Sequence, residues 1–254
     1  MSGPGEAAGA AVLTTTGHGW WLAGFPLLAA AVAALFALSL ARSFAVHPQP
    51  PMGLWALALA MFATASLAMF LGVRGGWTGG EFRVYWIFGA ILNVPYLALG
   101  EVYLLTRRRS VGHALLVLLL VGTAFAVWKV GTAFLTPDAL AKALPLGKDV
   151  FGDASAPYRI SQVYAFPAYF LLLGGVVWSA WQMRGRPDLR NRTGGAVAIA
   201  VGATIVAVGS GVGAGFNVVP LFSVSLAAGV TVMYLGFLTA RRPVDKRAGS
   251  PAAH

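Results

Sequence analysis

Seven long apolar stretches dominate the chain, and five of them contain no charged residue. Glu101 and Lys129 are the two charged residues inside the other stretches. A helix needs about 20 apolar residues to cross roughly 30 Å of hydrocarbon. The pattern therefore predicts an all-α, polytopic integral membrane protein built as a seven-transmembrane-helix bundle. The predicted spans are residues 20–40, 52–73, 85–105, 114–134, 160–181, 194–216 and 219–240.

Composition supports this class and leaves no room for a separate soluble domain. Of the 254 residues, 58% are hydrophobic and only 10% are charged, whereas an ordinary soluble domain has roughly 25% charged residues. We expect an extracytoplasmic segment at residues 1–19, a transmembrane domain at 20–240 and a basic cytoplasmic tail at 241–254. The chain contains no cysteine, which excludes disulfides and thiolate metal sites.

The distribution of basic residues predicts the orientation. The loops on one side of the membrane, together with the C-terminal tail, hold twelve Lys and Arg residues, and the segments on the other side hold five. Basic loops stay in the cytoplasm, so we expect the N-terminus outside and the C-terminus inside, in a plasma membrane. Because these residues lie at helix ends, the net charge of +10 indicates topology rather than nucleic-acid binding.

The longest connection between stretches, residues 135–159, stands out among short loops. Thr136, Pro137 and Asp138 form a helix-start pattern, which predicts a short interfacial helix followed by an irregular lid. Connections of this length are often functional or disordered. The sequence is compatible with either a functional lid or an ordinary connector.

Polar residues gather in the half of the bundle predicted to face outside. Lys129, Asn93, Arg159 and Gln162 are the candidate ligand-binding residues, because lipid cannot satisfy a buried amide or ammonium. The hypothesis is that they converge on an outward-open cavity beneath the long connection, whose positive potential favours an anionic or carbonyl-bearing ligand. The alternative is that Lys129 reaches the headgroups and that Asn93 packs between helices.

Glu101 is the only acidic residue inside a predicted span. It lies near the cytoplasmic end of its stretch, and we expect it to pair with Arg108 or with an arginine of residues 184–192. An ionisable group within a span is also a candidate for function by default. A proton-accepting or gating carboxylate is therefore the alternative.

The sixth stretch is rich in glycine between residues 202 and 215. Gly209 with Gly213, and Gly211 with Gly215, match the small-xxx-small spacing that lets two helices approach closely. This predicts close packing inside the bundle. Contact with a second copy of the chain or another membrane protein, and an unwound ligand-lining segment, are the alternatives.

The chain offers no catalytic, metal or cofactor site. None of the four histidines lies in a predicted span, so the paired axial histidines of a membrane haem are missing. HExxH and GxSxG are absent as well. We therefore predict no catalytic residue, no metal and no cofactor.

Seven spans with an external N-terminus resemble the topology of rhodopsins, and Arg83, Trp86 and Pro95 resemble residues of the microbial members. The resemblance implies a retinal-binding lysine in the seventh span. Ala227 stands at that place and the span has no lysine. Retinal binding is therefore not predicted, and no family is assigned.

The predicted function is that of a non-catalytic membrane protein. It is a sensor or ligand-binding module, or an accessory subunit of a membrane complex, with membrane lipids as partners. A small-molecule or ion transporter or channel is the first alternative, although seven spans do not readily form an inverted repeat. A membrane enzyme acting on lipid is the second.

Overall fold

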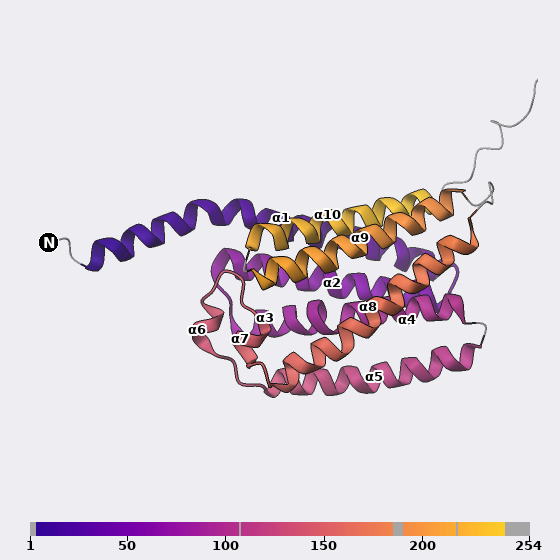
Figure 1. Cartoon of the computed structure of the whole chain (residues 1–254), viewed down its shortest axis with the longest axis horizontal. Coiled ribbons are helices and arrows are strands. Elements are labelled where there is room, and N and C mark those ends of the chain that lie inside the picture. Colours follow the sequence, from indigo (N-terminus) through magenta and orange to yellow (C-terminus); the bar gives the residue numbers. More distant parts are fainter. Residues whose placement is uncertain (1–3, 107, 185–189, 217, 242–254) are drawn as a thin grey trace, which may run out of the picture.

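The described part of the chain is entirely helical. The computed structural model describes residues 4–106, 108–184, 190–216 and 218–241, and its long helices run side by side (Figure 1). In chain order the helices are α1 (Pro4–Val46), α2 (Pro50–Gly75), α3 (Gly79–Tyr85), the π-helix η1 (Trp86–Leu92), α4 (Asn93–Leu105), α5 (Arg109–Thr132), α6 (Pro137–Leu140), α7 (Gly147–Phe151), α8 (Ala156–Gln182), α9 (Arg190–Gly215) and α10 (Val219–Ala240).

Seven helical segments are long and apolar enough to cross a membrane, with α3, η1 and α4 together forming one of them. This confirms the predicted all-α, multi-pass architecture. The first span, whose side chains are described from Ala23 onward, extends to Val46, and the third begins earlier than predicted, at Gly79. Apart from Arg241, the predicted basic tail lies outside the described residues.

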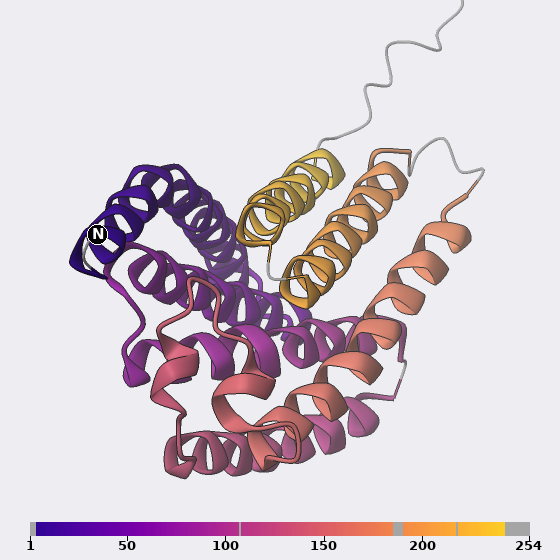
Figure 2. The same cartoon turned by 60° about the vertical axis from the view of Figure 1, so that its left-hand side comes forward.

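Six of the spans form a ring. Each packs on the next in the order α1, α2, the α3–η1–α4 segment, α8, α9 and α10, and α10 packs back on α1. The remaining span, α5, lies outside this ring against α4 and α8 (Figure 2). The inside of the ring is therefore lined by helices that are distant in sequence.

The first helix is far longer than a membrane requires. It has 43 residues, which at 1.5 Å per residue gives about 65 Å. Its N-terminal part extends beyond the rest of the bundle (Figure 1). The segment predicted to precede the first span is thus a continuation of the same helix from Pro4 onward.

The third span has a defined start and an irregular middle. Thr78 and Glu81 form a capping box, in which the Thr78 Oγ1 accepts from the Glu81 N–H at 3.2 Å and the Glu81 Oε2 accepts from the Thr78 N–H at 2.9 Å. Pro95 lacks an N–H and cannot complete a regular helical bond to the carbonyl one turn earlier. The chain widens into η1 just before this proline, which the sequence reading did not predict.

The long connection folds into two short helices. Thr136 and Pro137 begin α6, as predicted, while α7 takes the place of the irregular lid. The Thr136 N–H donates to the Val150 carbonyl at 3.0 Å, and Lys142 pairs with Asp149 at 2.7 Å. With Leu144 and Val150 buried, this α6–α7 connection is an ordered cap on one end of the bundle.

Glycines let α9 and α10 pack closely. A Cβ added at Gly202 would lie 2.5 Å from the Gly229 carbonyl oxygen, and one at Gly195 would lie 2.5 Å from that of Gly236. Gly209 and Gly213 meet Ser225 and Phe222 of α10 in the same way. The predicted close packing inside the bundle is therefore confirmed for these positions, whereas contact with a second copy stays a prediction. The surroundings of Gly215 lie outside the described part.

Candidate functional site

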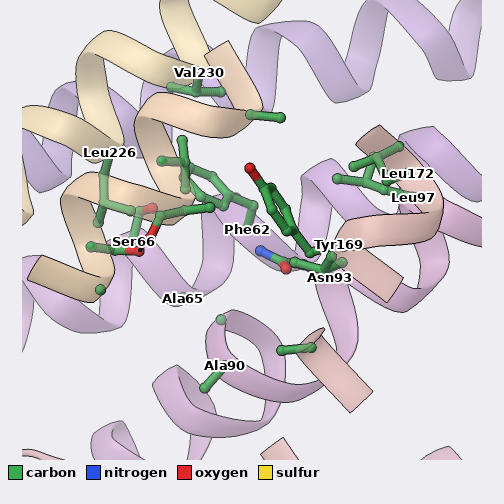
Figure 3. A pocket seen from close by; sticks show the side chains of 18 of the residues that line it. Phe62, Ala65, Ser66, Ala90, Asn93, Leu97, Tyr169, Leu172, Leu226 and Val230 are labelled. Atoms are coloured by element: carbon green, nitrogen blue, oxygen red, sulfur yellow. Dashed lines mark hydrogen bonds between the residues drawn. The ribbon is translucent and has the colours of Figure 1, made fainter. Parts of the chain in front are cut away.

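A cavity of about 510 Å³ lies inside the ring of helices. Its walls come from α2, the α3–η1–α4 segment, α8, α9 and α10, so five of the six ring members contribute. Most lining side chains are apolar, and none of the described lining residues is charged. Figure 3 shows Phe62, Leu226 and Val230 among these walls. The cavity thus offers a ligand an apolar environment at membrane depth.

The π-helical segment forms the wall that carries the cavity's amide group. Its lining residues recur as neighbouring pairs four positions apart along η1 and the turns on either side. These pairs are Tyr85 and Trp86, Gly89 and Ala90, and Asn93 and Val94. Short π-helical segments occur often at functional sites. Two neighbouring residues in each turn of this segment thus line the cavity.

Asn93 is the most informative polar residue in this wall. Its side chain is 6% exposed, and its Oδ1 is buried without a hydrogen-bond partner among the described residues. The side chain points toward the cavity (Figure 3). A buried polar atom without a partner costs about 1–3 kcal/mol. A ligand group that donates a hydrogen bond to this oxygen would remove that cost.

Other polar groups in the wall are hydroxyls. Ser66 of α2 and Ser210 of α9 line the cavity. Tyr169 of α8 also lines it, and its hydroxyl donates to Thr204 Oγ1 of α9 at 3.4 Å. This bond links the middle of α8 to the middle of α9. The sequence reading missed Ser66 and Tyr169, although a serine and a tyrosine within apolar stretches are polar groups that the sequence shows.

One end of the cavity is closed by aromatic side chains. Trp86 lines the cavity and lies 5.9 Å from Phe82, 5.7 Å from Phe151 and 6.5 Å from Tyr158 between ring centroids. Its Nε1 donates to the Pro157 carbonyl at 3.3 Å. Because Phe151 belongs to α7, the α6–α7 connection covers this end of the cavity through Trp86.

One side of the cavity borders the outer surface of the bundle. Phe166 and Phe170 of α8 and Val208 of α9 line the cavity, yet they are 61%, 66% and 55% exposed. Figure 1 shows α8 crossing the bundle obliquely and diverging from α9 toward the end where α8 begins and α9 ends. The cavity therefore reaches the lipid-facing surface between these two helices.

The structure brings only one of the four predicted ligand-binding residues to the cavity. Asn93 lines it, whereas Lys129, Arg159 and Gln162 do not. Lys129 lies on α5, outside the ring, and its Nζ is 4.4 Å from the ring centroid of the exposed Trp128. Arg159 and Gln162 are exposed near the start of α8. The predicted convergence is thus corrected, because these three side chains face away from the inside of the ring.

Glu101 is buried at a different contact from the predicted one. It is 3% exposed, and the Ser179 hydroxyl of α8 donates to its Oε1 at 3.1 Å. In the described part of the chain the only salt bridge joins Lys142 and Asp149, so the predicted pair with Arg108 is not formed. Arg186 and the side chains of Arg190 and Arg192 lie outside the described part. A proton-accepting or gating role for Glu101 stays a prediction.

The chain matches no model of a known protein family, no curated protein and no solved structure. Its described residues contain no group of three or more His, Asp or Glu side chains that could hold a metal ion. Fold and site together define a multi-pass helical membrane protein with an apolar cavity inside its bundle.

Proposed function

We propose that this protein is a non-catalytic binding module of a plasma membrane, which holds one small, uncharged, mainly apolar molecule in the cavity and acts as a sensor or as an accessory subunit. The observation that carries the proposal is the unpartnered Oδ1 of Asn93, a lining residue of a mainly apolar wall. The cavity volume of about 510 Å³ lies within the usual range of ligand sites.

The wall chemistry selects the ligand class. Burying an unpaired charge in an apolar site is very costly, and the described lining residues include no opposite charge. An amide side chain both donates and accepts hydrogen bonds, as a hydroxyl does. A long-chain alcohol fits this combination, with its hydroxyl at Asn93 and its chain along the apolar wall. This replaces the anionic or carbonyl-bearing ligand expected from the sequence.

The test compares two hexadecyl compounds, of which only one can donate a hydrogen bond. Purified protein in lipid nanodiscs is incubated with tritiated hexadecanol or with tritiated hexadecyl methyl ether, which accepts a hydrogen bond but cannot donate one. We expect saturable binding with a roughly three- to tenfold preference for the alcohol, since a net hydrogen bond contributes about 0.5–1.5 kcal/mol. Asn93→Leu should abolish that preference.

Two variants of α9, one that fills the cavity and one that does not, show whether binding occurs in this cavity. Ala207 of α9 lines it, so Ala207→Phe should reduce binding of both compounds. Val197, also on α9, is 49% exposed and is not a lining residue, so Val197→Phe should bind as the wild type does. The proposal fails if the wild type shows no saturable binding, or if the two variants bind equally well.

A further inference from the structure

We infer that the ligand enters this cavity sideways from the bilayer, through a gap between α8 and α9 whose rim is formed by Phe166, Phe170 and Val208. The inference rests on the proposed binding function, because it concerns the route to the same cavity. It assigns the ligand to the molecules dissolved in the membrane rather than to those in the surrounding water.

The rim residues border both the cavity and the outer surface of the bundle. Each of the three lines the cavity and is also more than half exposed on the outside of the bundle. In a membrane this outside surface meets acyl chains. Gly211, which also lines the cavity, has no atom within 4 Å of an added Cβ. The α9 side of the gap therefore holds open space.

The gap ends where α8 and α9 pack directly on each other. Leu172 and Val176 of α8 are packed against Ala196 and Ala200 of α9. The Tyr169 hydroxyl also donates to Thr204 Oγ1 at 3.4 Å, which joins the two helices beside this contact. Both helices run continuously along the gap, and Pro167 of α8 is the position there that supplies no backbone N–H.

Side chains close two other approaches to the cavity. Trp86 seals the end beneath the α6–α7 connection, where it packs on Phe82 and Phe151 and donates to Pro157. Between α2 and α4, the Trp55 Nε1 donates to the Leu97 carbonyl at 3.0 Å. The gap between α8 and α9 is the place where lining residues are themselves highly exposed.

Two valines of α9 give a matched pair for the test. Val201 and Val208 are seven residues apart, hence on one face of the helix, and are 48% and 55% exposed. Val208 lines the cavity and Val201 does not. Val208→Trp should narrow the gap, whereas Val201→Trp places the same bulk two turns away against lipid.

The measured quantity is the time course of tritiated hexadecanol transfer from donor vesicles to protein in nanodiscs. We expect Val208→Trp to slow loading about tenfold, as when binding requires a rearrangement, with final occupancy similar to the wild type. Val201→Trp should load at the wild-type rate. Phe170→Ala should load faster than the wild type, and it provides a second measurement if Val208→Trp does not fold.

The outcomes separate the route from the function. If the wild type binds and the valine variants load at equal rates while Phe170→Ala brings no acceleration, the lateral route is overturned and the binding function stands. If the wild type never retains hexadecanol, the binding function itself fails. Slow loading by Val208→Trp with normal loading by Val201→Trp supports the route.

Discussion

Three polar residues inside the spans, Asn93, Glu101 and Lys129, reach three different arrangements. Asn93 lines the cavity, and its Oδ1 is buried without a partner among the described residues. Glu101 accepts a hydrogen bond from Ser179, and Lys129 lies over an aromatic ring of its own helix. The sequence shows that each group is costly in a membrane, but the partner of Glu101 lies 78 residues away on another helix. That partner could not be predicted without the helix arrangement.

Replacing Asn93 should stabilise the empty protein. Asn93→Leu removes an unpartnered buried oxygen at a position beside open space, so we expect the free energy of unfolding to rise by about 1–3 kcal/mol. Denaturant titration of ligand-free protein in mixed micelles measures this. A decrease in stability would show that the amide has a partner in the membrane.

Removing the donor to Glu101 should have the opposite effect. Ser179→Ala leaves a buried carboxyl oxygen without its 3.1 Å hydrogen bond, and we expect a loss of about 1–3 kcal/mol in the free energy of unfolding. Ser179→Thr keeps a hydroxyl and serves as the control. The same titration applies, and equal stability of Ser179→Ala and the wild type would contradict the contact.

At the scale of the helices, the sequence predicted which segments form spans but not how the helices are arranged in the bundle. Seven apolar stretches were enough to find the spans, and Thr78 with Glu81 carries a recognisable helix start. The position of α5 outside the ring has no counterpart in the sequence. Lipid and the bundle interior are both apolar, so a lipid-facing surface and a buried one have similar residues. The π-helix before Pro95 was missed for lack of a specific residue pattern.

The α9–α10 contact predicts opposite effects for two glycines of one helix. An added Cβ at Gly202 collides with α10, whereas one at Gly194 has no atom within 4 Å. Gly194→Ala should stabilise by up to about 1 kcal/mol through helix propensity, and Gly202→Ala should destabilise by about 1–3 kcal/mol through overpacking. Unfolding titrations compare the two. A shift of the same sign in both would argue against the close packing.

At the scale of the whole molecule, an odd number of spans separates the two ends of the chain. Figure 1 shows the start of α1 and the end of α10 at opposite ends of the bundle. The structure shows that the two ends are opposed, while the choice of side rests on the basic residues of the sequence. The α6–α7 connection lies at the same end as the start of α1.

Reporter fusions test the proposed orientation. A reporter that is active only in the cytoplasm should work after His254 and fail when inserted before Trp20 or within the α6–α7 connection. The insertion in the connection tests the span count independently of the termini. Activity before Trp20 together with silence after His254 would reverse the topology and remove the role given to the basic loops.

On the proposed function and route, a cavity sealed by Trp86 beneath the α6–α7 connection and open between α8 and α9 responds to the concentration of its ligand within the plane of the bilayer. For a ligand that enters from the bilayer, occupancy follows its mole fraction among the lipids and not its total amount in the sample. Adding empty lipid at constant ligand should therefore dilute the ligand and lower occupancy, even though nothing is removed. Such a protein reports the composition of its own membrane.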